Sequence, residues 1–256
     1  MSERHEYPAG VPCWVDVLVP DPDAVLTFYG DLFGWDFTDP GPNGYRVARV
    51  MGRDVAGLGV AQALPSWNTY IRVESVDAAA ERAAEDGATV LVEPMDALPA
   101  GRLAVIVDPT GAAFAIWEAR EREGAELVNE AGTWTMSSLH TPDPAAASAF
   151  YGALFGWESE PRGSMTLLRL EGYIGGRAKQ PVPRDVVAVM APPAPDIPPH
   201  WNVNFQISDA DLTAELTASL GGAVIEGPFD TPGFRNAVLA DPQGAVFSVS
   251  QLVFAR

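Results

Sequence analysis

Two side chains of this 256-residue chain are candidates for proton transfer, namely Asp16 and His140. Each lies in a segment whose apolar and polar residues alternate as in a strand. An acid is seldom buried without a partner, so an inward-facing Asp16 would have a raised pKa and would suit a general base. Two alternatives remain open. His140 is an ordinary hydrogen-bonded or solvated imidazole in the first, and Asp16 forms an ion pair with Arg72, Arg102 or Arg235 in the second.

The two candidates lie in corresponding segments of an internal repeat, two positions apart in register. FYGDLFGW at 28–35 and FYGALFGW at 150–157 agree at seven of eight positions, at an offset of 122 residues. Trp67-Asn68 recurs as Trp201-Asn202, and DPTG at 108–111 recurs as DPQG at 241–244. The preserved order indicates a duplication, with modules at residues 10–118 and 132–251 and a charged linker at 119–131.

Local patterns predict the same order of elements in each module. Residues 12–19 alternate as a half-buried strand, and Asp21 with Pro22 begins a helix that Gly34 ends. Strands are expected at 35–37, 45–50 and 55–61, then a strand at 69–73, a helix between Asp77 and Gly87, and three more strands. Each module is therefore predicted to contain two βαβββ units, and the chain an α+β fold of four.

The repeated motifs also carry a family resemblance. The pattern V-P-D-P-x(5)-F-Y-x-x-L-F-G-W, followed by D-P-x-G-x-x-F, resembles the vicinal oxygen chelate superfamily of glyoxalases, extradiol dioxygenases and bleomycin resistance proteins. GVPCWVDVLVPD and WNTYIRVESVDA are similar to two-module, glyoxalase-like proteins of actinobacteria, a group with a mycobacterial antigen and an anthracycline-biosynthesis accessory protein. The resemblance covers nearly the whole chain. It implies curved, mixed eight-stranded sheets around a ligand cavity.

The resemblance also implies where a metal would be bound. Enzymes of the superfamily hold a divalent ion with His, Gln or Glu from the first, fifth and last strands of a module. The family's spacing places these positions at Trp14, Ile71 and Ala115 and at Met136, Val203 and Ser248. None is a usual ligand for such ions. We therefore expect neither the family's metal nor another cofactor, with relocated ligands as the alternative.

On the same count, the cavity wall is expected to be mainly aromatic and aliphatic. The ligand-binding residues predicted in this way are Trp14, Leu18, Trp67, Ile71, Trp117, Met136, Ser138, Trp201, Val203, Phe205 and Ser248. Such a pocket suits a flat, bulky, mostly apolar molecule, although tryptophans of this kind also fill cores. Asp16 and His140 would face each other across it. The proline-rich segment 181–199 is expected to be a cavity rim or lid, or else a passive surface loop.

Composition limits the partners and the compartment. A net charge of −18 disfavours nucleic acid and anionic membranes as partners. The single Cys13 cannot form an internal disulfide, no run of eighteen apolar residues occurs, and the first ten residues lack a signal pattern. We expect a cytoplasmic protein. The internal duplication favours a monomer, with a dimer as the alternative.

The sequence thus predicts a metal-free protein that binds a hydrophobic, aromatic small molecule such as a polyketide or quinone metabolite. Sequestration, resistance and assistance to a pathway enzyme are the roles expected of it. One alternative is an enzyme, either an isomerase, cyclase or lyase that uses Asp16 and His140, or a dioxygenase-like metalloenzyme. Another, suggested by the resemblance alone, is an interaction protein or secreted antigen.

Overall fold

A computed structural model of the chain describes residues 2–41, 43–61, 64–175 and 182–253. The first module contains β1 (Pro12–Val19), a 3₁₀ turn (Pro22–Val25), α1 (Leu26–Phe33), β2 (Asp36–Phe37), β3 (Arg46–Val50), β4 (Arg53–Val60), β5 (Ser66–Arg72), α2 (Val76–Glu85), β6 (Thr89–Ala97), β7 (Gly101–Val107) and β8 (Ala113–Ala119). The second contains β9 (Thr133–His140), α3 (Pro144–Phe155), β10 (Glu158–Arg162), β11 (Met165–Arg169), β12 (Val186–Ala191), β13 (His200–Ile207), α4 (Ala210–Ser219), β14 (Ala223–Thr231), β15 (Phe234–Ala240) and β16 (Val246–Leu252).

Each module forms one mixed, eight-stranded sheet. The strand order is β2-β3-β4-β1-β5-β8-β7-β6 in the first sheet and β10-β11-β12-β9-β13-β16-β15-β14 in the second. The pairs β1–β4 and β5–β8 are parallel, as are their counterparts β12–β9 and β13–β16. The predicted α+β fold of four βαβββ units is confirmed.

The helices begin and end where the sequence predicts, with one exception. Asp21 and Asp143 cap the first helical segment of their modules by accepting hydrogen bonds from backbone N–H groups three residues on. Gly34 and Gly156 end those segments with a left-handed backbone, at φ 73° and 74°. The exception is α2, whose N-cap is Ser75 rather than the predicted Asp77.

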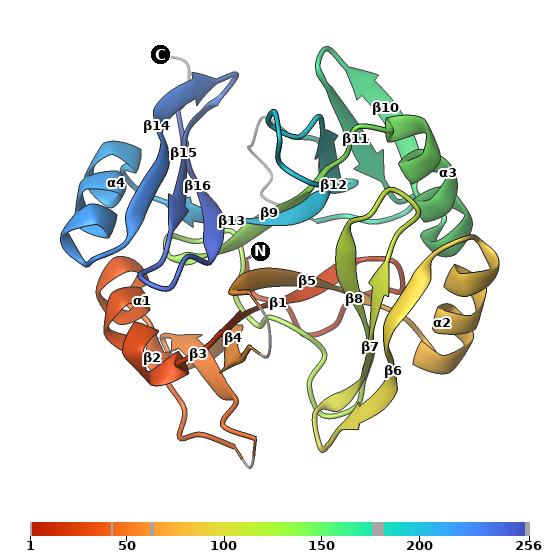
Figure 1. Cartoon of the computed structure of the whole chain (residues 1–256), viewed down its shortest axis with the longest axis horizontal. Helices are drawn as coiled ribbons and strands as arrows, with labels where there is room; N and C mark the ends of the chain where they lie inside the picture. The colour runs from red at the N-terminus through yellow and green to blue at the C-terminus, as the bar shows by residue number, and fades with distance from the viewer. Residues whose placement is uncertain (1, 42, 62–63, 176–181, 254–256) are drawn as a thin grey trace.

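The two curved sheets pack back to back. Each has an outer face, which carries the helices and meets the other module, and a concave inner face, and the two inner faces open in opposite directions (Figure 1). At the contact, Thr69 Oγ1 and Ser137 Oγ are 2.7 Å apart, and the rings of Trp67 and Phe205 lie 4.9 Å apart. One hydrophobic core therefore runs through both modules.

A buried Tyr–Asp hydrogen bond joins the modules, and it occurs twice. The Tyr29 hydroxyl, from the first FYG motif, donates to Asp241 of the second module's DPQG turn at 2.9 Å, and the Trp67 indole donates to the same hydroxyl at 3.1 Å. The reciprocal set repeats this arrangement with distances of 2.8 Å and 2.9 Å, and it consists of Tyr151, Asp108 and Trp201. We call these two sets the inter-module Tyr–Asp pairs.

The last residue of each FYGxLFGW motif also reaches the other module. The Trp35 indole donates to the Gly132 carbonyl, and the Trp157 indole donates to the Gly10 carbonyl, each at 2.7 Å. Both glycines come just before the first strand of a module and have left-handed backbones, at φ 78° and 79°. The motif thus fixes where the neighbouring module begins.

Two further expectations concern the surface. Of the proline-rich segment 181–199, residue 181 lies outside the described residues, 186–191 form β12, and Pro199 lies beside Gly111 of the first module. Among the helices of the described ranges, none has the length and apolar character needed to cross a membrane.

Removing the hydroxyl of one inter-module pair is expected to destabilise the whole chain. Tyr29→Phe leaves a buried carboxylate oxygen of Asp241 without that donor, which should lower the free energy of unfolding by about 1.5–3 kcal/mol. Tyr151→Phe should cost a similar amount because its environment is equivalent. Chemical denaturation followed by circular dichroism measures both. Two variants that each unfold within about 0.3 kcal/mol of the wild type would contradict the assigned role.

Candidate functional site

The inner face of the first module centres on the carboxylate of Asp16. Its side chain is buried, with 1% of the residue exposed. It accepts hydrogen bonds from the Tyr70 hydroxyl at 2.7 Å, the Asn68 amide at 2.9 Å and the Tyr45 hydroxyl at 3.1 Å. No arginine in the described ranges pairs with it. The pairing of Asp16 with an arginine, which the sequence left open, is therefore absent among the residues that the structure describes.

Burial dominates the protonation of Asp16. Desolvation raises the pKa of this carboxyl above its ordinary value of 3.8, and the hydrogen bonds from Tyr70, Asn68 and Tyr45 offset only part of that effect. The group is an acceptor held by neutral donors rather than a member of an ion pair.

Tyr45 fills the space over the inner face of the first module. A Cβ placed at Gly57 would lie 1.8 Å from the Tyr45 hydroxyl oxygen, and one at Gly59 would lie 3.0 Å from its ring. The Trp14 indole donates to the same hydroxyl at 3.0 Å. The two glycines are therefore required for the ring to reach Asp16.

The first residues of the linker cover the same face. The Arg122 guanidinium lies 5.2 Å from the centre of the Trp14 ring, a cation–π distance, and 3.4 Å from a carboxylate oxygen of Asp54. The Trp117 indole donates to the Arg122 carbonyl at 2.9 Å. As a result Trp14 and Trp117 are buried, and the chain's own side chains occupy this inner face.

The inner face of the second module carries smaller and more polar side chains at the equivalent positions. Strand register aligns the following residues of the first and second modules, in that order: Trp14 and Met136, Asp16 and Ser138, Leu18 and His140, Tyr70 and Asn204, Leu103 and Asn236, Ala115 and Ser248, Trp117 and Ser250. Of the second set, all except Ser250 keep part of their surface exposed. This face is therefore open to solvent where the first is closed.

Short polar pairs line this second face. The Asn202 amide donates to Ser248 Oγ at 2.8 Å, and the Asn204 amide donates to Ser250 Oγ at 2.7 Å. Ser138 Oγ and His140 Nε2 are 3.0 Å apart. Amides and hydroxyls of this kind can orient a neutral ligand by hydrogen bonds.

Two imidazoles stack at the edge of the second face. The His140 and His200 rings are 4.8 Å apart and 3° from parallel, and His200 Nδ1 lies 2.8 Å from the Pro198 carbonyl oxygen. Burial, and next the proximity of His200, lowers the pKa of His140 to about 4. His140 is therefore neutral at physiological pH.

The structure corrects part of the sequence-predicted wall. Trp14, Leu18, Trp117, Met136, Ser138 and Ser248 lie on inner faces as expected. On the middle strands, β5 and β13, the side chains predicted to line the cavity face the contact between the sheets instead. They are Trp67, Ile71, Trp201, Val203 and Phe205. The inward residues of these strands that the sequence did not identify are Asn68, Tyr70, Asn202 and Asn204. The repeated Trp-Asn pair was a signal for Asn68 and Asn202, and alternation then places Tyr70 and Asn204 on the same face.

The predicted acid/base pair is also wrong as a pair. Asp16 lies on the inner face of the first sheet and His140 on that of the second, and these faces open in opposite directions (Figure 1). The two groups cannot act on one bound molecule.

The side chains on the two inner faces do not fit the metal that the fold family implies. Ile71 and Val203 point away from these faces, and Asp16 is the only carboxylate at the compared positions of both modules. Glu118 and Gln251 instead accept from the backbone at the starts of α2 and α4. Within the described ranges, no group of three His, Cys, Asp or Glu side chains could hold a metal ion.

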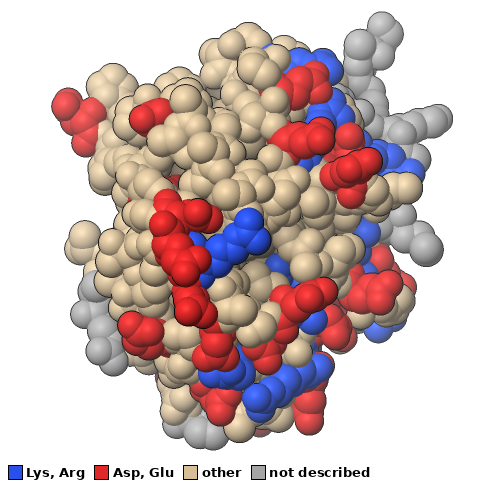
Figure 2. Space-filling view, turned by 90° about the vertical axis from the view of Figure 1, so that its right-hand side faces the viewer, with Lys and Arg blue, Asp and Glu red and all other residues tan. Residues whose placement is uncertain are grey.

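Two arginines at equivalent positions of the modules form surface ion pairs. Arg102 pairs with Asp77 and Asp96, and Arg235 pairs with Asp211 and Asp230, so that both arginines bind acidic side chains of their own module rather than Asp16. Acidic and basic side chains lie interspersed on the face of the molecule seen in Figure 2.

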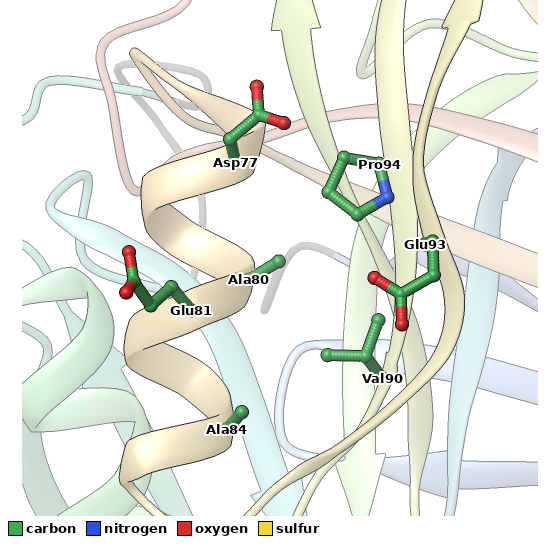
Figure 3. A pocket seen from close by; sticks show the side chains of 7 residues that line it. All are labelled: Asp77, Ala80, Glu81, Ala84, Val90, Glu93 and Pro94. Carbon is green, nitrogen blue, oxygen red and sulfur yellow. The ribbon is translucent and has the colours of Figure 1, made fainter.

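An open groove of about 510 Å³ runs between α2 and β6 (Figure 3). Its lining combines small apolar side chains with carboxylates, namely Asp77, Ala80, Glu81, Ala84, Val90, Glu93 and Pro94. Asp77 is already paired with Arg102, so we assign no binding function to this groove.

The raised pKa of Asp16 makes stability depend on pH. The folded state binds the Asp16 proton more tightly than the unfolded state, so this group's contribution is lost as pH rises above about 4. In Asp16→Asn that loss is absent. Its free energy of unfolding relative to wild type should therefore increase with pH between the unfolded and folded pKa values of Asp16, with a slope of at most about 1.4 kcal/mol per pH unit. Urea titrations between pH 4 and 8 measure this. Asp23→Asn, at an exposed site, is the control, and parallel curves for Asp16→Asn and wild type would refute the assignment.

The lowered pKa of His140 makes the stability of the folded state depend on pH in the acidic range. The folded state resists protonation of this ring, so stability is complete above 6.5 and is lost as pH falls toward about 4. His140→Gln should gain stability relative to wild type over that window. Histidine-selective NMR, assigned with this variant, should show one ring that titrates near 4. A His140 ring that protonates at its ordinary value would contradict the burial described above.

Comparison with known proteins agrees with this architecture. The glyoxalase-like domain model matches residues 13–117 and 122–250. A protein of Mycobacterium tuberculosis named "Putative glyoxylase CFP32" is 42% identical over 260 residues, which cover 97% of each chain. The anthracycline biosynthesis protein DauV of Streptomyces sp. (strain C5) is 35% identical, over 96% of this chain and 94% of that protein.

Solved structures show the same fold at low sequence identity. The Mn(II)-bound glyoxalase from Novosphingobium aromaticivorans superposes with a TM-score of 0.66 at 20% identity, over 95% of this chain and 82% of that chain. The 2,3-dioxygenase LapB from Pseudomonas sp. KL28 gives 0.66 at 13% identity, over 96% and 94%. Sequence and fold together place this chain in the family of glyoxalase-like domain proteins, as a member with two modules.

Proposed function

We propose that the protein binds a flat aromatic small molecule with oxygen substituents, such as a polyketide or quinone metabolite, on the inner face of its second module and without a metal ion. The observation that carries the proposal is the difference between the two inner faces. Large aromatic side chains close the first, whereas Asn, Ser and His leave the second polar and partly exposed.

The chemistry of the second face supports this ligand class. Its neutral amides and hydroxyls suit carbonyl and hydroxyl substituents, and the stacked imidazoles provide a flat surface beside them. The likeness to DauV, named for anthracycline biosynthesis, favours a polycyclic ligand. Sequestration, resistance or assistance to a pathway enzyme are the roles that such binding serves.

Ser250→Trp tests the location of the site. The equivalent position in the first module is occupied by Trp117. A tryptophan at position 250 should therefore fill the inner face of the second module. The probe is 2,6-dihydroxyanthraquinone in equilibrium dialysis. We expect one bound probe per wild-type chain and at least about tenfold weaker binding by the variant, because each 1.4 kcal/mol is a factor of ten.

The controls separate occlusion from misfolding and from metal dependence. Leu212→Trp adds an indole on the exposed side of α4 and should leave affinity unchanged. Ser248→Leu is a smaller obstruction for use if Ser250→Trp does not fold. Dialysis against EDTA should change affinity less than about twofold. No binding by wild type, or binding that requires an added dication, would refute the proposal.

A further inference from the structure

A chain of polar side chains in the second module leaves one atom without a partner. The Asn204 amide donates to Ser250 Oγ at 2.7 Å, Ser250 Oγ donates to Asn236 Oδ1 at 2.6 Å, and the Asn236 amide donates to Thr231 Oγ1 at 2.8 Å. Every group in this chain donates to the next. The amide nitrogen of Asn204 is therefore used, and its Oδ1 makes none of the bonds in this chain.

Asn204 Oδ1 is buried and, among the residues that the structure describes, has no hydrogen-bond partner. Buried carbonyl oxygens are nearly always paired, and an exception calls for a water, an ion or a ligand. Asn202 offers an internal comparison. It makes the same kind of bond to Ser248, but its oxygen is not buried without a partner.

The first module shows how the chain satisfies an acceptor on an inner face. There the acceptor is Asp16, and two phenol hydroxyls donate to it, from Tyr70 and Tyr45. In the second module the position of Tyr70 is taken by Asn204 itself, and Val189 and Ala191 replace the glycines beneath Tyr45. The second face thus has an acceptor and lacks the phenols that serve the first.

We propose that Asn204 Oδ1 accepts a hydrogen bond from the hydroxyl of a phenolic ligand on the inner face of the second module. This inference rests on the proposed function and narrows it, because aromatic molecules that carry only carbonyl or ether oxygens cannot supply the donor. Asn204 is then the residue that determines specificity, and Ser250 and Asn236 hold its amide in place.

A matched pair of probes tests the donor. Wild type should bind 2-naphthol about tenfold more tightly than 2-methoxynaphthalene, as measured by isothermal titration calorimetry. In Asn204→Leu this preference should fall to within about twofold, through weaker binding of 2-naphthol. Asn204→Asp keeps an oxygen acceptor and should keep the preference, and so should Leu212→Trp, which changes an exposed residue of α4 outside the inner face.

The outcomes distinguish this inference from the function on which it rests. If wild type binds both probes equally and Ser250→Trp abolishes both, the site is correct and the role of Asn204 is wrong. A preference for the methoxy probe, or a preference that survives in Asn204→Leu, also overturns the inference. If wild type binds neither probe, the proposed function fails with it.

Discussion

The inter-module Tyr–Asp pairs are the constraint on which the rest of the molecule depends. Each buried tyrosine hydroxyl bridges an indole of its own module and a turn carboxylate of the other, so that neither outer face is complete alone. With both outer faces used for this contact, the inner faces open in opposite directions. Among the described residues, the inner-face side chains of the two modules therefore cannot meet on one ligand.

The same constraint explains which residues the two modules share. The contact between the modules uses three shared features: the FYGxLFGW motif, the Trp of the middle strands and the Asp of D-P-x-G. Each hydrogen bond that they make occurs a second time at the position related by the duplication. A change of the Tyr or the last Trp of FYGxLFGW, or of the turn Asp, removes a hydrogen bond to the other module. Inner-face residues have no such partner, and there the modules differ at most positions, as Trp117 and Ser250 illustrate.

Much of the fold could be predicted from the sequence, but the sequence could not show which side chains of the middle strands, β5 and β13, face inward. Caps, glycine stops and the repeat identified the elements because these signals are local. Side chains at 67–71 are mostly buried on both faces of β5. Alternation of apolar and polar residues needs one polar side, so it does not show which of these side chains face inward. Spacing carried over from the family predicts Ile71 inward, whereas the residues that face inward at this level are Asn68 and, in the second module, Asn202. Closure by Tyr45 and Arg122 depends on contacts between distant segments and has no local signal.

The divergence of the inner faces follows from sharing one core. Packing Tyr45 and two tryptophans over Asp16 buries apolar area in the first module, and the common core extends that stability across the contact. The second module can then keep short polar side chains and an unpaired oxygen on its inner face, features that destabilise an isolated domain. A duplicated fold thus separates two demands that a single module must meet together, a well-packed interior and an accessible polar surface for a guest.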